Sequence, residues 1–226
     1  MFKKQPKPID PESSHTEVRL LEAAGEIFAE FGYRAATVRQ ICEKAGANVA
    51  AVNYYFGDKE QLYLAVLRSV PDAHADKYPY RRGMNGNATA EELLRAYIES
   101  LLHRVFDTGR PGWHTKIMAR EMVEPTRALD SLLEEVARPL HQELAAIVRQ
   151  LLGSEADDDD VRLCALSIMG QCVYYHHARA VIARLYPEHK NDAEDIVRLV
   201  HHITEFSLAA LKDIAQKRQA PIHESR

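Results

Sequence analysis

Apolar residues recur three and four positions apart along most of this chain, which is the spacing of amphipathic helices. No stretch alternates with period two over a useful length, so the pattern predicts no sheet. We expect an all-α protein of about nine helices, with an N-terminal three-helix domain followed by a larger helical domain. The expected helices cover residues 16–31, 37–46, 48–56, 58–70, 89–108, 113–123, 125–152, 161–186 and 192–219.

Two of these helices are short and are joined by a tight turn. Thr37 is a good N-cap for the first of them, and Gly46 ends it, because glycine tolerates the left-handed conformation that a helix C-terminus needs. Asn48 caps the second helix, whose Val52 and Phe56 share the inward face. This arrangement predicts a helix-turn-helix, whose second helix enters the major groove of DNA. On spacing alone, a plain helical hairpin remains the alternative.

Proline and glycine set the other boundaries. Residues 71–88 are rich in Pro, Gly and Asn and are expected to form a loop. Pro139 should kink or split the helix over 125–152 near Arg138, and Pro187 should end the helix over 161–186. We therefore expect a flexible arm over residues 1–15, a DNA-binding domain over 16–70 and a helical ligand-binding and dimerisation domain over 71–226.

The last two expected helices have apolar residues on more than one face. Such helices are buried on two sides, and a second copy of the chain is the natural cover for the outer side, because a two-fold interface is self-complementary. We expect a homodimer through these two helices.

Composition narrows the class of protein. The chain has 226 residues, 46% of them hydrophobic, and a net charge of -4. It shows no apolar run long enough to span a membrane and no signal peptide, so we expect a cytoplasmic protein without a membrane partner. Over residues 1–70 the basic side chains only balance the acidic ones, so a DNA-binding surface must come from where charges lie.

Nothing in the sequence indicates catalysis, a cofactor or a metal. There is no Gly-rich phosphate loop and no His-Glu-x-x-His motif, and Cys42 has no ordered base around it. Cys42, Cys164 and Cys172 lack zinc spacing, and we expect buried packing rather than a redox sensor. The acidic run 157–160 is interpreted as a solvated helix start, not as a metal site. Adjacent histidines on a helix point about 100° apart, so neither His pair forms a chelating face.

The residues of the helix-turn-helix carry a family resemblance. Thr37, Val38, the turn Ala45-Gly46 and the run Asn53-Tyr-Tyr-Phe-Gly-Asp-Lys-Glu60 resemble the DNA-binding signature of the TetR family of transcriptional regulators. The resemblance is strong over residues 16–70, and residues 116–125 resemble the CecR-like branch. It implies a repressor that binds a palindromic operator in double-stranded DNA as a dimer and is released by a small-molecule effector. A helical interaction module without specific DNA binding is the rival hypothesis.

The resemblance also implies roles for individual residues. Thr37 and Tyr54 would bind phosphates through hydroxyls, Lys59 through its charge, and Arg39 would reach a base or phosphate. Tyr55 is assigned either to DNA or to a structural role. The expected DNA-binding residues are Thr37, Arg39, Asn48, Val49, Ala50, Ala51, Asn53, Tyr54, Tyr55 and Lys59.

Val at position 49 and Ala at position 51 depart from the commonest family pattern, so direct base readout should be thin and shape readout larger. For the effector, an aromatic and methionine stripe on helices suggests either a pocket or plain core. The candidate effector-binding residues are Trp113, His114, Met118, Glu121, Tyr174, Tyr175 and His177.

Overall fold

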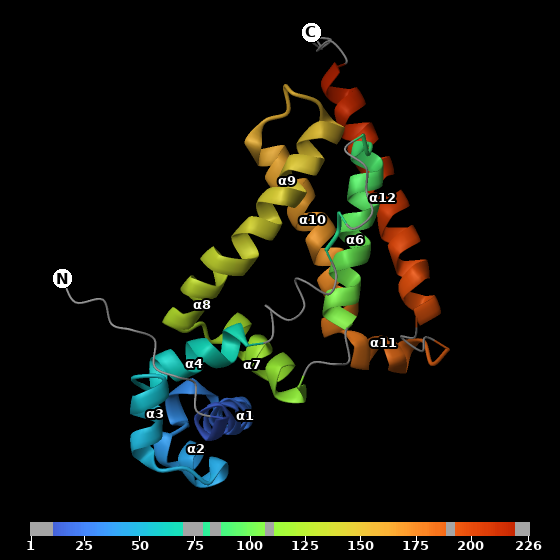
Figure 1. The fold of residues 1–226 in the computed structure, drawn as a ribbon. Coiled ribbons are helices and arrows are strands. Elements are labelled where there is room, and N and C mark those ends of the chain that lie inside the picture. The colour runs from blue at the N-terminus through green and yellow to red at the C-terminus, as the bar shows by residue number, and fades with distance from the viewer. Residues whose placement is uncertain (1–10, 70–78, 82–86, 107–110, 189–192, 220–226) are drawn as a thin grey trace, which may run out of the picture. The chain divides into compact units, whose positions relative to one another are not determined.

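The computed structural model describes residues 11–69, 79–81, 87–106, 111–188 and 193–219, and within these residues the only regular structure is helical. The all-α expectation is confirmed. The chain divides into two compact units (Figure 1), the first made of residues 1–73 and 108–136 and the second of residues 74–107 and 137–226. We call these unit 1 and unit 2.

Unit 1 is built around its first helix. Its helices are α1 (Pro11–Ala35), α2 (Val38–Ala45), α3 (Val49–Tyr55), α4 (Lys59–Arg68), α7 (Gly112–Val123) and α8 (Arg127–Leu132). α1 packs against α2, α4 and α7. The backbone leaves the helical conformation at Gly32, where φ is 75° and ψ is 165°, so the expected stop lies at this glycine although the helix resumes to Ala35.

Helices α7 and α8 were expected in the C-terminal domain, yet they pack with the N-terminal helices in unit 1. α7 contacts α1, and α8 contacts α4. Ile117 of α7 and Ala128 of α8 are 1% and 2% exposed and belong to the same core cluster as Phe28 of α1. Apolar spacing predicted α7 correctly as a helix, but spacing carries no information on which neighbour a helix covers.

Unit 2 is a group of long helices around a second core. Its helices are α6 (Ala90–Phe106), α9 (Arg138–Leu152), α10 (Asp158–His177), α11 (Arg179–Leu185) and α12 (Ala193–Gln219). α6 lies beside α12, α9 and α10, and α10 contacts α9, α11 and α12 (Figure 1). The core includes Leu94, Ile98, Leu144, Ile147, Ile168, Cys172 and Ile203.

Two breaks occur in long helical stretches, and only one was expected. A π-helical segment, η1 (Leu133–Ala137), precedes α9, which begins at Arg138 with Pro139 in its first turn, as the proline predicted. The expectation of one helix over 161–186 is wrong, because α10 ends at His177 and α11 starts at Arg179. Ala178 between them has φ −87° and ψ 5°. Neither proline nor glycine marks this junction, so no local signal predicts it.

The three cysteines pack as expected. Cys42 and Cys172 are buried, Cys164 is half-buried, and none forms a disulfide. Burial raises the pKa of Cys172 to about 12. Because the thiolate is the reactive form, this thiol is inert at neutral pH, which favours packing over a redox role.

Candidate nucleic-acid interface

Helix α2 is fixed at both ends by its own residues. The Thr37 N–H donates to Gln40 Oε1 at 2.9 Å, and the Gln40 N–H donates to Thr37 Oγ1 at 3.2 Å, which together form a capping box. At the other end Gly46 is left-handed, with φ 61°, and its N–H donates back to Glu43 O at 3.3 Å. The turn that follows therefore has a defined direction.

Helix α3 buries one face and exposes the other. The Asn48 side chain caps it by accepting from the Ala50 N–H at 2.9 Å, and Val52 is 0% exposed in the core of unit 1. On the opposite face Val49 and Tyr54 are 48% and 69% exposed, and Ala50 and Asn53 are exposed too. A seven-residue helix with only one buried residue is positioned to display this outer row.

The start of α4 closes the motif. Asp58 caps α4 by accepting from the Gln61 N–H at 2.8 Å, and Gly57 before it has φ 90°. Tyr55 and Phe56 are half-buried against the core of unit 1, and the Tyr54 ring meets the Tyr55 ring edge-on at 4.9 Å. For Tyr55, this packing favours the structural alternative.

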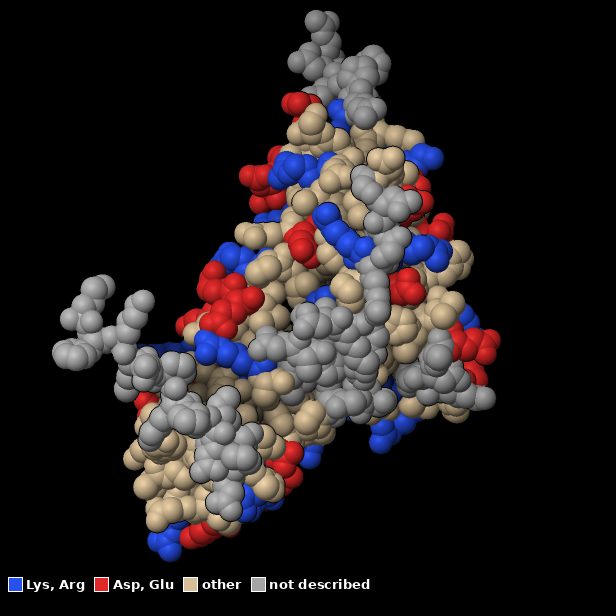
Figure 2. Space-filling model, viewed as in Figure 1, with Lys and Arg blue, Asp and Glu red and all other residues tan. Residues whose placement is uncertain are grey.

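Charges around the helix-turn-helix largely balance one another. Arg39 Nε donates to Glu43 Oε1 at 2.8 Å, and Lys44 Nζ lies 2.5 Å from Glu26 Oε2. Figure 2 shows that much of the visible surface over α2 and α3 belongs to neither basic nor acidic residues. The charges of Arg39 and Lys44 are therefore partly neutralised by neighbouring carboxylates.

The ten expected DNA-binding residues lie on α2, on α3, at the N-caps of these two helices and at the first residue of α4. Seven are exposed, namely Thr37, Arg39, Asn48, Val49, Ala50, Asn53 and Tyr54, and three are half-buried, namely Ala51, Tyr55 and Lys59. Lys59 differs from the rest because its ammonium donates to the carbonyl oxygen of Ala36 at 2.7 Å.

Four candidate effector-binding residues lie on α7 in unit 1. Trp113 covers Gly25 of α1 so closely that a Cβ there would lie 2.5 Å from the indole ring. His114 and Glu121 are buried, and Met118 packs against the same core. These side chains thus contribute to the packing of α7 on the N-terminal helices.

Glu121 is the centre of a buried hydrogen-bond network. Tyr63 Oη donates to its carboxylate at 2.6 Å, and the N–H and hydroxyl of Thr126 donate at 2.9 and 3.0 Å. Burial, followed by the bond to Glu121, raises the pKa of Tyr63 well above its usual value. Arg120 beside it donates to the Glu30 carbonyl at 3.0 Å. Sequence reasoning missed the Tyr63–Glu121 bond of this network, because its partners are 58 residues apart.

The other three candidate effector-binding residues lie on α10 in unit 2. Tyr174 is 60% exposed, His177 is exposed, and Tyr175 packs partly against the core of unit 2. The seven candidates therefore belong to two different units, with four on α7 and three on α10.

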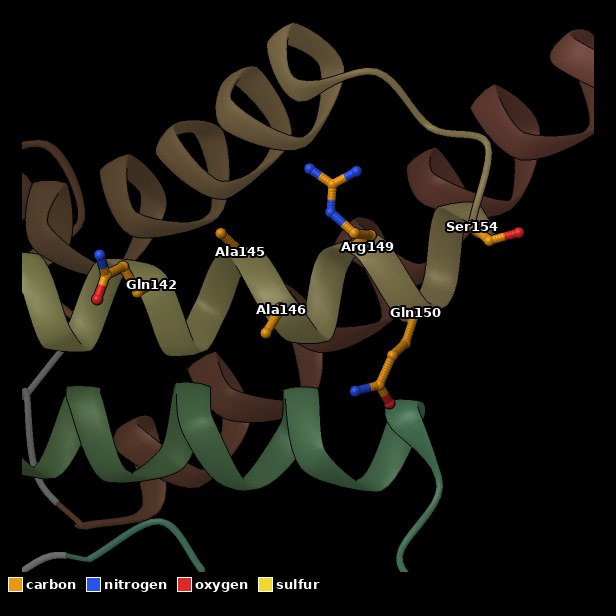
Figure 3. A pocket seen from close by; sticks show the side chains of 6 residues that line it. All are labelled: Gln142, Ala145, Ala146, Arg149, Gln150 and Ser154. Atoms are coloured by element: carbon orange, nitrogen blue, oxygen red, sulfur yellow. The ribbon is translucent and has the colours of Figure 1, made fainter.

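Among the residues that the structure describes, unit 2 has a small hollow and a larger one. The small one is a partly open space of about 10 Å³ lined by Tyr80, Tyr97, Ser100, Leu101, Arg104 and Leu140, which is room for no more than a water. The other is an open hollow of about 600 Å³ along α9, lined by Gln142, Ala145, Ala146, Arg149, Gln150 and Ser154. Figure 3 shows Arg149 and Gln150 leaving α9 in opposite directions. Arg149 is held by Ala156 O at 2.8 Å and by Asp158.

Among the residues described, no cluster of three or more His, Cys, Asp or Glu side chains could hold a metal ion. Within the same residues, no helix is both long and apolar enough to cross a membrane.

Two family models match this chain. Residues 20–66 match the model described as "Bacterial regulatory proteins, tetR family". Residues 90–211 match the model described as "HTH-type transcriptional dual regulator CecR, C-terminal domain", which is more than half of the chain.

Individual proteins agree with these matches. The chain is 28% identical to the HTH-type transcriptional dual regulator CecR of Shigella flexneri over 173 residues, which is 73% of this chain and 77% of that protein. It is 47% identical to the HTH-type transcriptional repressor AcnR of Corynebacterium glutamicum over 58 residues, or 26% of this chain and 30% of that protein. The crystal structure of the transcriptional regulator FadR from Bacillus subtilis in complex with stearoyl-CoA has a similar fold, with a TM-score of 0.60 at 20% identity over 85% of this chain and 97% of that one.

Proposed function

This chain belongs to the TetR family of bacterial regulatory proteins, with a CecR-type C-terminal domain, and we propose that it represses transcription from a palindromic operator as a homodimer that a small molecule releases. Family membership makes it a DNA-binding transcriptional regulator and not an enzyme. To this family function the proposal adds that the protein represses, that its operator is a palindrome, that it binds as a dimer and that a small molecule releases it from DNA. This function places the protein in the cytoplasm with the DNA.

The observation that carries the proposal is the exposed row on α3. Val49, Ala50, Asn53 and Tyr54 lie outward on a helix that caps fix at its start. Tyr54 at 69% and Val49 at 48% exposure give this row an apolar surface that a partner can cover. The major groove is wide enough for one helix, and this row fits it.

We assign base reading to Asn53 and the small apolar side chains. The amide of Asn53 offers a donor and an acceptor to an adenine edge, while Val49 and Ala50 suit thymine methyl groups. Asn48 and the half-buried Ala51 and Tyr55 flank this row. With so few base contacts, sequence-dependent DNA shape should contribute to specificity.

Phosphate contacts come from Tyr54, Thr37 and Arg39. The Thr37 hydroxyl donates to Gln40 Oε1 at 2.8 Å, so it must turn its hydrogen away from Gln40 to reach a phosphate. Arg39 keeps the N–H groups of its terminal nitrogens for DNA while Nε holds Glu43. These contacts set register and orientation.

A second copy of the chain would cover the outer faces of α10 and α12. Large apolar side chains are exposed there in unit 2, at Leu163, Leu166, Tyr174, Val197 and Phe206. A two-fold axis through this surface repeats α3 in the partner, and the two copies then read half-sites one helical turn, roughly 34–36 Å, or a multiple of it apart.

We place effector binding in unit 2. The bound stearoyl-CoA in the FadR structure indicates one ligand class to test, a long acyl chain on an anionic head group. The hollow beside Tyr97 and Arg104 combines apolar and basic side chains that suit such a ligand, but at about 10 Å³ it must open to admit one. Tyr174, Tyr175 and His177 on α10 remain candidate contacts, whereas Trp113, His114, Met118 and Glu121 serve the packing of unit 1.

The deciding experiment is selection of bound sites from random duplex DNA by the purified dimer, with its mass measured by sedimentation. The expected result is an inverted repeat bound by two chains. Asn53→Ala should then weaken operator binding by about 1–3 kcal/mol per half-site, with bulk DNA unaffected. Gln142→Ala on α9 of unit 2, which also removes a side-chain carboxamide, is the control and should bind like the wild type.

Equal and weak binding of all sequences would contradict the proposal and favour the interaction module. A reporter gene carrying the selected site separates the two directions of regulation. Repression lowers its expression when the protein is present, and an acyl-CoA or other effector restores it. Increased expression would instead assign activation, which the description of the Shigella relative as a dual regulator makes a specific alternative.

A further inference from the structure

The ammonium of Lys59 is engaged by the junction between α1 and α2. Lys59 Nζ donates to Ala36 O at 2.7 Å and lies 3.4 Å from Arg34 O. It also sits 4.7 Å from the centroid of the Tyr33 ring. Two carbonyl groups and one aromatic ring, from the end of α1 and the residue after it, therefore surround the ammonium group of the first residue of α4.

These acceptors are ones that a helix end leaves without partners. The last carbonyls of a helix have no N–H of their own, and they lie at the negative end of its dipole. Ala36 is 1% exposed, so water has little access to it. A lysine ammonium is a suitable substitute, because a charged donor makes the stronger hydrogen bond and the Tyr33 ring face attracts a cation.

The contact between Lys59 and Ala36 lies where it can influence the orientation of the helix-turn-helix. Ala36 directly precedes Thr37, the N-cap of α2, and α2 carries α3. Lys59 thus ties the start of α4 to the point where α2 begins. A shift at Ala36 would rotate α2 and with it the exposed row of α3.

A phosphate contact competes with this arrangement. Two of the three N–H groups of the ammonium point to Ala36 O and Arg34 O, and its charge lies against the Tyr33 ring, so a phosphate would have to use the remaining N–H or displace these contacts. Lys59 is half-buried, and this burial lowers its pKa. Arg39 and Lys44, by contrast, are exposed and form ion pairs with Glu43 and Glu26 at the surface.

We propose that Lys59 is a positioning residue of the DNA-binding unit, which holds the α1–α2 junction in place for α3 and does not contact a DNA phosphate. The inference rests on the proposed DNA-binding function. It replaces the direct phosphate contact that the family resemblance implied for this lysine.

Salt dependence distinguishes the two roles. A lost phosphate contact flattens the plot of log affinity against log salt by about 0.9 per contact. A positioning residue leaves that slope unchanged and lowers specific affinity at every salt concentration. The test therefore compares Lys59→Gln with the wild-type dimer on the selected operator and on unrelated DNA, at a temperature where both are folded.

We expect Lys59→Gln to reduce the ratio of operator to unrelated-DNA affinity by about tenfold, with the salt slope unchanged. We also expect its Tm without DNA to fall by about 2–8 °C, because a buried carbonyl loses its donor. Lys44→Gln is the matched control, with the same change of charge on an exposed lysine of the same unit, and should leave Tm unchanged. Arg39→Gln calibrates the slope that a cation near DNA contributes.

A flatter salt slope for Lys59→Gln overturns the inference while leaving the proposed function intact, and so does an unchanged Tm. Failure of the wild type to select any operator refutes the proposed function instead, and the Tm comparison still tests the contacts of Lys59. If Lys59→Gln does not fold, Lys59→Arg replaces it as the test variant. A phosphate contact would survive this change in full, whereas the planar guanidinium fits the two carbonyls and the ring less well and should lower both Tm and the specificity ratio.

Discussion

Replacing Gly25 by alanine tests whether α7 is an integral part of unit 1. A Cβ at this position would lie 2.5 Å from Cδ2 and Cε2 of Trp113 and 2.8 Å from Cε3. Real Cβ atoms do not approach other atoms so closely, so either the indole or α7 has to move. Both responses disturb the contact between α1 and α7.

The expected change in the free energy of unfolding follows from two opposing effects. Overpacking a core costs about 1–3 kcal/mol, and three ring atoms within 2.8 Å place this site at the upper end. Replacing glycine by alanine inside a helix stabilises the helix by about 1 kcal/mol. The net destabilisation is about 2 kcal/mol, which lowers Tm by roughly 4–8 °C in a chain of this size.

Urea unfolding provides the assay, because Trp113 is the one tryptophan among the 226 residues and its fluorescence reports this contact directly. Gly112→Ala, at a glycine of α7 with nothing within 4 Å of its Cβ position, is the control and should be neutral or slightly stabilising. In a Trp113→Ala background, followed by circular dichroism, Gly25→Ala should raise stability by about 1 kcal/mol. The same sign of effect in both backgrounds would refute the packing argument.

Two further changes test the caps and the buried network. Asn48→Ala removes the cap of α3 and should cost about 1 kcal/mol and weaken operator binding, whereas Asn48→Ser keeps an acceptor and should do neither; equal effects of both would contradict this. Tyr63→Phe removes the bond to Glu121 and should cost about 1.5–3 kcal/mol at pH 7. Because the native pKa of Tyr63 is raised, the stabilisation from its hydroxyl is present below pH 10 and is lost above it by about 1.4 kcal/mol per pH unit. The free energies of unfolding of the wild type and Tyr63→Phe should therefore converge from pH 9 to 11. A constant difference over this range would contradict the role given to the Tyr63 hydroxyl.

The helix-turn-helix could be predicted from sequence because its determinants are local. Thr37, Asn48 and Asp58 each cap a helix through a backbone N–H two or three residues away, and Gly46 supplies the left-handed turn. Such signals need no knowledge of the rest of the fold. The same holds for Asp157, which accepts from the Asp160 N–H at 2.8 Å and confirms the helix start expected for the acidic run.

The partners of these residues could not be predicted in the same way. Lys59 donates to a carbonyl 23 residues earlier, and Tyr63 to a carboxylate 58 residues later. Neither separation follows a helical or strand period, so the pattern of the sequence cannot indicate the pair. The family resemblance assigned Lys59 to DNA and Glu121 to an effector, while their contacts in unit 1 favour roles in holding its helices together.

The boundary between the sequence families and the boundary between the compact units do not coincide, and this bears on how an effector acts. The CecR-type model covers residues 90–211, yet α7 and α8 within that range pack with the helices of the TetR-type model in unit 1. Contacts run from α7 to α1, from α1 to α2 and from α2 to α3. Gly25 under Trp113, the Arg120 bond to Glu30 and the Glu121 bond to Tyr63 tie α7 to α1 and α4. We therefore expect a displacement of α7 to reach the exposed row of α3 within one unit, and Gly25→Ala, which weakens the first of these contacts, should reduce effector release more than operator affinity.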